Sequence, residues 1–196
     1  MVESVKAPPA GEALDLLDIL IAYDTVALTP NLDLIDDVRV RLESLGATVV
    51  LTYDDTQTKA NLFATIGPDI EGGVVLSGHS DVVPVDPADW TTPPFKADRR
   101  EGRVYGRGTA DMKGFVAAAV HCMERAARSD LRTPLHLALS YDEELGCVGV
   151  HSMIDMLAAA PFRPMFCIVG EPTLLSVATG HKGKTGCQAV CKGREG

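Results

Sequence analysis

Helical and strand-like patterns of apolar residues alternate along the chain. Leucine, isoleucine and valine recur at helical spacing in several segments, one of which follows Asn31, a favourable N-cap residue. The spacing predicts helices over residues 12–23, 32–45, 112–128 and 148–160. In the third of these helices, the stripe expected to be most buried consists of Phe115, Ala119, Cys122 and Ala126.

Short apolar runs between polar loops are typical of β-strands. They predict strands over residues 47–53, 61–67, 74–77, 103–105, 135–141 and 165–169. The unbroken run 74–77 is typical of a strand that is buried on both faces, and 165–169 is expected to be a further buried strand. We therefore expect an α/β fold with a mixed, largely parallel central sheet and flanking helices. After residue 175 the pattern changes to two β-like pieces, 176–180 and 186–191.

The net charge argues against two classes of binding partner. The 196 residues are 46% hydrophobic, which is enough for one substantial core. Eighteen Lys+Arg against 27 Asp+Glu give a formal net charge of -9, which disfavours binding to nucleic acid or to an anionic membrane. No apolar run near the N-terminus is long enough to span a bilayer or to act as a signal core. We therefore expect neither nucleic acid nor membrane as a partner.

The cysteines indicate a reducing compartment. There are five, an odd number, and none belongs to a CxxC pair. Because most of them stand in apolar runs, we expect buried, reduced thiols and a cytoplasmic location.

Candidate chemistry begins where the apolar run 74–77 ends, at His79 and Asp81. In an extended chain, side chains two residues apart point to the same face, so these two can meet. An imidazole beside a carboxylate is the usual arrangement of a metal ligand and the group that orients it. Taken alone, this stretch is more simply explained as a surface histidine and a turn aspartate.

Further acidic positions follow His79 at regular intervals. Asp111, the pair Glu143 and Glu144, and Glu171 stand at successive spacings of 32, 32 and 27 residues, each close to one βα unit of about 30 residues. Most of these positions directly follow a predicted strand. Because parallel strands share one edge at their carboxyl ends, we expect the side chains to converge there.

Convergence of so many carboxylates requires a cation. Asp81, Asp111, Glu143, Glu144 and Glu171 could not all stay ionised at close range without one. One imidazole with several carboxylates suits zinc or a related divalent ion, and a bridging carboxylate would allow two ions about 3.5–4 Å apart. Neighbouring Glu143 and Glu144 point opposite ways in extended chain, so one can bind metal and the other can act as a base. The pattern does not say which.

Each position also has a structural explanation. Asp111 could cap the helix predicted from Met112, the glutamate pair could lie in a helix first turn, and Glu171 could be a turn residue before Pro172.

Two other classes of function are possible. Residues 178–185 end in a Walker-like Gly-Lys-Thr, but a P-loop needs a helix directly afterwards, and 186–191 has a strand pattern. A non-catalytic metal-binding or interaction module is the other alternative.

Four motifs in order resemble the M20 family of di-zinc aminoacylases and peptidases. They are GHSDVVP at 78–84, GRGTADMKG at 106–114, YDEELG at 141–146 and VGEPT at 169–173. Within the family, segments 23–35, 140–150 and 180–184 look most like the acetylornithine deacetylase branch, with succinyl-diaminopimelate desuccinylases nearest to it. The resemblance implies a zinc-exopeptidase-like catalytic domain and hydrolysis of a small N-acyl amino acid.

The resemblance also implies a role for each candidate residue. His79 and Glu171 would bind one zinc ion, Asp111 would bridge, and Glu144 would bind the second ion. Asp81 would orient His79, and Glu143 would be the general base that activates water and protonates the departing amine. Cobalt or manganese could replace zinc.

The domain organisation implied by the resemblance is incomplete. Residues 1–175 would be the N-terminal part of the catalytic domain, and 176–196 the start of an α+β lid or dimerisation domain. A lid histidine and a later zinc ligand are expected beyond Gly196. We therefore expect residues 1–196 alone to have little or no deacetylase activity and the complete protein to be a homodimer.

Overall fold

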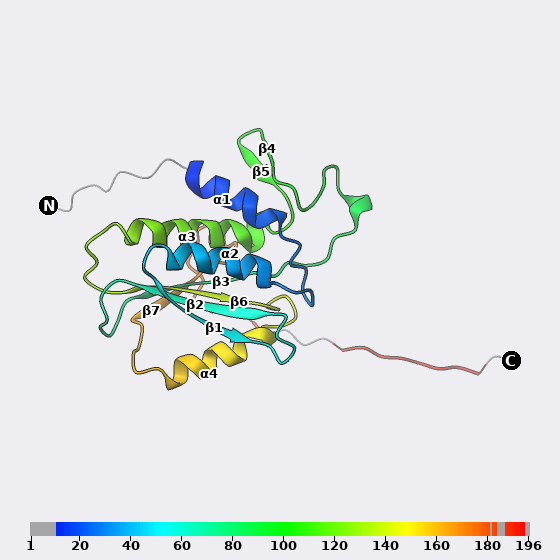
Figure 1. Cartoon of the computed structure of the whole chain (residues 1–196). Helices are drawn as coiled ribbons and strands as arrows, with labels where there is room; N and C mark the ends of the chain where they lie inside the picture. Colours follow the sequence, from blue (N-terminus) through cyan, green and yellow to red (C-terminus); the bar gives the residue numbers. More distant parts are fainter. Residues whose placement is uncertain (1–10, 181, 184–186, 195–196) are drawn as a thin grey trace.

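The fold is a central sheet with helices on both faces, as Figure 1 shows. The computed structural model describes residues 11–180, 182–183 and 187–194. Helices α1 (Gly11–Ala22), α2 (Leu32–Glu43) and α3 (Gly114–Ala126) form the layer on one side. Helix α4 (His151–Ala159) covers the other side. This layering confirms the α/β fold expected from the sequence pattern.

The central sheet has the strand order β1-β2-β6-β3-β7 in the described part of the chain. Strand β2 pairs antiparallel with β1 and β6, whereas β3 pairs parallel with β6 and β7, so every strand except β2 points the same way. The sheet is therefore mixed and largely parallel, as expected. The strands are β1 (Thr48–Tyr53), β2 (Ala60–Ile66), β3 (Val74–His79), β6 (Leu135–Ser140) and β7 (Phe166–Val169).

The carboxyl ends of β3, β6 and β7 lie at one edge of the sheet because these strands are parallel neighbours. The residues that follow His79, Ser140 and Val169 are therefore brought together. This edge carries the candidate site.

The main core lies between the sheet and the helical layer. Leu20, Ile35, Leu62, Leu137 and Leu139 are each fully buried there. A smaller core under α4 contains Phe63 and Met153. Burial of these apolar side chains is the main force that holds the layers together.

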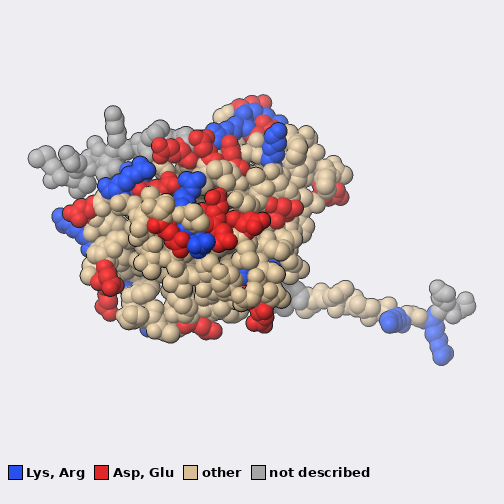
Figure 2. All heavy atoms as spheres, in the orientation of Figure 1, with Lys and Arg blue, Asp and Glu red and all other residues tan. Residues whose placement is uncertain are grey.

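A separate hairpin, β4 (Asp98–Arg100) and β5 (Arg103–Tyr105), lies beside α1. Arg99 joins it to that helix through ion pairs of 2.8 Å with both Asp15 and Asp18. Acidic side chains gather over the helical layer in Figure 2, with lysine and arginine side chains scattered among them.

Strand β7 differs from its expected environment. Its run was predicted to be a buried strand, but all four residues are exposed, Phe166 by 53% and Val169 by 59%. The reason is its place in the sheet order, because β7 is an edge strand and pairs only with β3.

The expected strands after residue 175 are not formed. The described residues 176–180 and 187–191 are extended and exposed and belong to no strand, because no neighbouring chain segment pairs with them. Gly186 and the loop residues His181, Lys184 and Thr185 lie outside the described residues.

Helix α3 begins at Gly114, two residues later than expected, and α4 begins at His151 instead of residue 148. Asp111 and Met112 have non-helical backbone angles, so the chain makes a tight turn over Thr109–Lys113 before the helix starts. The expected buried stripe of α3 is confirmed at Ala119 and Ala126 and wrong at Cys122, which is exposed; Phe115 is half-buried. The buried face also includes Val116, Val120 and Met123.

The expectation of buried thiols is also wrong, since all five cysteines are exposed. Cys122 lies on the outer side of α3, Cys147 in a loop and Cys167 on the edge strand, so an apolar sequence neighbourhood did not imply burial.

A turn closed by Asp54 connects β1 to β2. Its carboxylate accepts hydrogen bonds from the hydroxyl of Thr56 and from the backbone N–H groups of Thr56, Thr58 and Lys59. Burial on its own would raise the pKa of Asp54, but these hydrogen bonds outweigh it and lower the pKa to about 2. A lowered pKa in the folded state stabilises the fold above the ordinary value of 3.8, and this contribution is lost as the pH falls toward about 2.

We expect Asp54→Ala to lower the melting temperature near neutral pH by about 2–4 °C, which corresponds to about 1 kcal/mol for a lost cap of backbone N–H groups. The difference from wild type should shrink as the pH falls below 3.8. Thermal unfolding across this range measures it, with the exposed neighbour Asp55→Ala as control. A difference that is unchanged at the acid end would contradict the assignment.

Candidate metal centre

His79 ends strand β3 and is almost completely buried, with 1% exposure. Its Nδ1 lies 2.8 Å from the backbone carbonyl oxygen of Asp81 and 3.5 Å from that residue's carboxylate. Because a carbonyl oxygen can only accept, Nδ1 carries a proton and donates it, so Nε2 is the nitrogen left to bind a metal ion. A metal ion bound at Nε2 would displace any proton there and leave the Nδ1–H tautomer that a metal ligand requires.

Asp111 lies in the turn before α3 and faces the imidazole. Its Oδ1 is 3.1 Å from Nε2 of His79, and the N-cap position of α3 is occupied by Lys113 without a side-chain cap. The capping explanation of Asp111 is therefore wrong. The fully buried Lys113 anchors the turn by donating from Nζ to the carbonyl oxygen of Tyr23 at 2.7 Å.

Glu143 and Glu144 lie in the loop that follows β6, before the short helical turn at Val148–Val150. They are not in a helix first turn, so that alternative is also wrong. The backbone N–H groups of both residues donate to the carboxylate of Asp81, each at 3.1 Å. Asp81 thus links the loop to the end of β3. Glu143 Oε2 lies 3.8 Å from Nε2 of His79.

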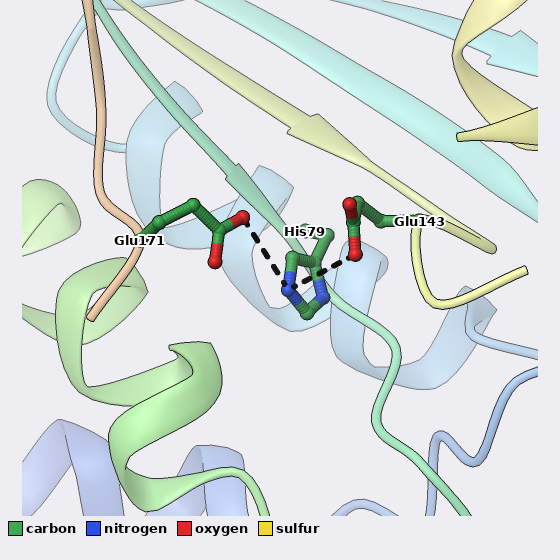
Figure 3. A group of neighbouring side chains, drawn as sticks. All are labelled: His79, Glu143 and Glu171. Atoms are coloured by element: carbon green, nitrogen blue, oxygen red, sulfur yellow. Dashed lines mark ion pairs between the residues drawn. The ribbon is translucent and has the colours of Figure 1, made fainter. Parts of the chain in front are cut away.

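Glu171 follows β7 and reaches the same nitrogen from another side. Its Oε1 lies 3.9 Å from Nε2 of His79, and Figure 3 shows Glu171 and Glu143 flanking the imidazole ring. Gly170 allows the chain to reach this position because its backbone packs directly against the ring of Phe115. A Cβ at Gly170 would lie only 1.9 Å from the ring of Phe115, so this position accepts only glycine.

The structure therefore brings together all the candidate residues. Two groups have ligand atoms within 4.8 Å of one another: His79 with Glu143 and Glu171, and His79 with Asp111 and Glu144. We call the five residues of these groups the His79 cluster. The grouping differs from the expected division, in which Glu143 is not a ligand, and the individual roles stay predictions.

The pKa values within the His79 cluster reflect crowded charges. Burial would lower the pKa of His79, but the hydrogen bond and charge of Asp81, with the charge of Glu143, raise it to about 9. Burial raises the pKa of Glu144, and so does the nearby charge of Asp111. Burial, Asp111 and Glu143 likewise raise the pKa of Glu171, against the opposing effect of His79. The carboxylates resist being ionised together, which is the conflict that a bound cation would relieve.

Asp81 is the exception among these carboxylates. Burial on its own would raise its pKa, but hydrogen bonds from His79 and from the N–H groups of Glu143 and Glu144 lower it below the ordinary value. The shift of Asp81 is therefore opposite in direction to those of Glu144 and Glu171, and it favours the ionised form that a group orienting an imidazole needs.

Sequence reasoning missed a buried polar layer behind the His79 cluster. It consists of Asn31, Lys59, Asn61, Ser80 and Asp142, which are each buried and hydrogen-bonded. Their polar character within or beside apolar runs was the available clue.

The chain belongs to the peptidase family M20/M25/M40, a family of hydrolases. The family model matches residues 75–183, more than half of the chain. The match includes every member of the His79 cluster.

Curated relatives agree with this assignment. The chain is 36% identical over 190 residues to "Acetylornithine deacetylase" of Pasteurella multocida, covering 93% of this chain and 49% of the relative. It is 37% identical over 177 residues to the Proteus mirabilis protein of the same name, covering 87% and 45%. The chain spans about half the length of the curated relatives it matches.

Solved structures share the fold. Human carnosine dipeptidase 1 has a TM-score of 0.63 and 26% identity, covering 74% of this chain and 35% of the dipeptidase. The M20 family metallo-carboxypeptidase Sso-CP2 from Sulfolobus solfataricus has a TM-score of 0.71 and 22% identity, covering 81% and 37%.

None of the described helices is both long enough and apolar enough to cross a membrane.

Proposed function

We propose that this chain forms, or contributes to, a metal-dependent amide hydrolase that removes the acetyl group from N-acetylornithine to give ornithine and acetate. The observation that carries the proposal is the convergence of one buried imidazole and four carboxylates at a single sheet edge. The similarity to acetylornithine deacetylases supports the choice of substrate. Succinyl-diaminopimelate, or another N-acyl amino acid or peptide, is the alternative substrate.

The donor set suits divalent zinc, with cobalt or manganese as substitutes. Nitrogen and carboxylate ligands are those that zinc binds, and Nε2 of His79 faces carboxylate oxygens of Asp111, Glu143 and Glu171 at 3.1, 3.8 and 3.9 Å. We assign His79, Asp111 and Glu171 to one ion. Asp111 would bridge to a second ion, which Glu144 would bind, and Asp81 would orient His79.

A divalent ion held there would polarise the substrate carbonyl and lower the pKa of water. Glu143 would accept a proton from the attacking water and pass it to the amine that leaves. Its position in a partly exposed loop beside the imidazole allows both transfers without a large movement. Asp81 would hold the loop and the imidazole in register through its hydrogen bonds.

The proposal extends to the domain organisation, assembly, pathway and location of the complete protein. Residues 1–175 would be part of the catalytic domain, 176–196 would begin a lid or dimerisation domain, and the complete enzyme would be a homodimer. The reaction would serve arginine biosynthesis. The five free cysteines support a reducing, cytoplasmic location.

Zinc titration of the purified chain by calorimetry tests the metal centre. We expect at least one zinc ion per chain, and we expect binding to be lost in His79→Ala. The matched control is His151→Ala, because His151 is an exposed histidine at the start of α4. A chain that binds no zinc, or binds it equally well without His79, would refute the proposal.

The substrate is tested separately. In whichever form turns over substrate, residues 1–196 or a longer chain that contains them, N-acetylornithine should be hydrolysed in preference to succinyl-diaminopimelate and to dipeptides. A reversed preference would replace the substrate and leave the metal centre standing. ATP binding by this chain would instead favour the P-loop alternative, although the described residues 187–194 form no helix of the kind that a P-loop needs.

A further inference from the structure

We propose that Lys59, assisted by Asn61, is a positioning residue that holds the loop carrying Glu143 and Glu144 against the rest of the metal centre. We define this loop as residues 141–149. The inference rests on the proposed function, because it assigns a purpose to a buried polar layer that contains no predicted metal ligand.

Lys59 forms a buried ion pair directly behind the loop. Its Nζ lies 2.7 Å and 2.6 Å from the two carboxylate oxygens of Asp142, and both residues are less than 10% exposed. The same carboxylate accepts the backbone N–H of Leu28 at 3.0 Å. The ammonium group also lies 5.8 Å from the ring centre of Tyr141. The loop residue next to Glu143 is thus fixed from two separate segments of the chain.

The pair acts at the point where the backbone changes direction. Asp142 has a φ of 52°, a left-handed conformation that aspartate tolerates better than most residues. This turn directs the N–H groups of the next two residues, Glu143 and Glu144, toward the carboxylate of Asp81. If the turn relaxed, both glutamates would move together, because they follow Asp142 directly in the chain.

Asn61 ties the loop at both of its ends. Its Oδ1 accepts the backbone N–H of Tyr141 at 3.3 Å, and its Nδ2 donates to the carbonyl oxygen of Gly149 at 3.0 Å. Gly149 must approach closely for this contact, since a Cβ there would lie 2.0 Å from the carbonyl oxygen of Tyr141. The start of β2 therefore acts as a frame to which the first and last residues of the loop are attached.

Asn31 links the start of β2 to the residues that follow β3. Asn31 exchanges two hydrogen bonds with the backbone of Ala60, at 2.9 Å and 3.0 Å, and donates to the hydroxyl of Ser80 at 3.0 Å. Ser80 stands between His79 and Asp81. One connected set of buried hydrogen bonds thus sets the position of the imidazole relative to the two glutamates.

A role in stability alone is the competing explanation. Buried ion pairs often add little net stability compared with apolar residues of similar size, so their presence is not explained by stability in general. The two explanations predict that a variant at Lys59 disturbs different parts of the structure. A positioning role predicts local opening of the loop and altered metal binding, whereas a stability role predicts effects spread over the whole fold.

Hydrogen exchange of the chain, followed by NMR at single amides, measures the loop without any metal. In Lys59→Met we expect the amides of Glu143 and Glu144 to exchange about tenfold faster or more, because local opening replaces a fixed turn. Amides within α3 should keep their protection. Asp142→Asn, which preserves the shape of the side chain, and Asn61→Ala should open the same amides. The control is Arg41→Met, which breaks an ion pair of 2.9 Å with Glu124 in the helical layer.

Zinc affinity, measured by competition with a chromophoric chelator, is the second readout. Lys59→Met should bind zinc about 10–100-fold more weakly, the range seen when groups that orient metal ligands are lost. The double variant Lys59→Met, Asp142→Asn should be no weaker than the weaker of the two single variants, because Lys59 acts through Asp142.

The outcomes separate this inference from the proposed function. Unchanged exchange at Glu143 and Glu144 would overturn the positioning role, and so would faster exchange throughout α3 with an equal effect in Arg41→Met. Local opening in a chain whose wild type binds no zinc would support the positioning of the loop and refute the metal centre. If Lys59→Met does not fold, Asp142→Asn decides by the same measurements.

Discussion

In a form of the protein that turns over substrate, replacement of Glu143 by glutamine is expected to reduce turnover of the N-acyl amino acid by about 10²–10⁴-fold, the usual contribution of a general base. An amide cannot accept the proton of the attacking water, although it fills the same volume. Zinc affinity should change little, because the proposed role of Glu143 is not that of a ligand. Steady-state kinetics and zinc competition on the same preparation measure both quantities.

Glu144→Gln is the matched comparison, because the two glutamates are adjacent and donate equivalent hydrogen bonds to Asp81. It should weaken zinc binding, most strongly for the second equivalent. The geometry makes this a strict test, since Glu143 is the glutamate grouped with His79 and Glu171 in the structure. If zinc affinity falls in Glu143→Gln and persists in Glu144→Gln, the two roles are exchanged.

Cys147→Ser serves as a further control. The thiol of Cys147 lies 3.4 Å from Oε1 of Glu143 and is exposed. A hydroxyl can make the same hydrogen bond, so this variant should keep both turnover and zinc binding. Loss of turnover here would show that the thiol itself contributes to the chemistry.

The members of the His79 cluster could be found from the sequence because each stands close to the end of a strand or at the start of a helix. Strand ends can be located from short apolar runs, and parallel strands bring their ends to one edge by geometry alone. The spacing between His79 and Asp111 carried real information, since the two side chains lie 3.1 Å apart. Which glutamate faces which partner depends on side-chain rotamers and loop angles, which no spacing determines.

The buried layer behind the cluster could not be predicted in the same way. Lys59 and Asp142 are 83 residues apart, and no local pattern marks either residue as the partner of the other. Lys59 directly precedes β2 and Asp142 follows β6, so their pairing depends on β2 lying antiparallel beside β6. Which strands are neighbours is set by the strand order of the sheet. Strand order is fixed by the packing of the whole sheet, and local patterns do not reveal it.

The same limit explains the error at β7. An apolar run indicates that a strand can be buried, but its position in the sheet decides whether it is. Phe166 and Val169 belong to such a run and are exposed, because β7 is the last strand in the order. At α3 the error was local: the motif around Asp111 looks helical in composition, while its backbone angles are not.

Asp81→Ala is expected to weaken zinc binding by about 100-fold, the upper end of the range for a group that orients a metal ligand. The reason is that Asp81 contacts both the imidazole of His79 and the loop that carries the two glutamates. Its backbone carbonyl and its carboxylate both lie near Nδ1 of His79, and the carboxylate also accepts the N–H groups of Glu143 and Glu144. The alanine variant keeps the carbonyl contact but releases the glutamate loop from the strand that carries the imidazole. Competition with a chelator measures the affinity, and circular dichroism checks the fold.

Two comparisons show whether the loss arises from this double contact. Asp81→Asn retains a single carboxamide oxygen where the carboxylate has two, so we expect an affinity between those of alanine and wild type. Asp89→Ala removes an exposed acid from the loop that follows β3 and should leave the affinity unchanged. If Asp81→Ala binds zinc as tightly as Asp89→Ala, the hydrogen bonds that join His79 to the glutamate loop do not organise the metal centre. The order alanine, asparagine, wild type would instead indicate that the two carboxylate oxygens act together, one for each glutamate N–H.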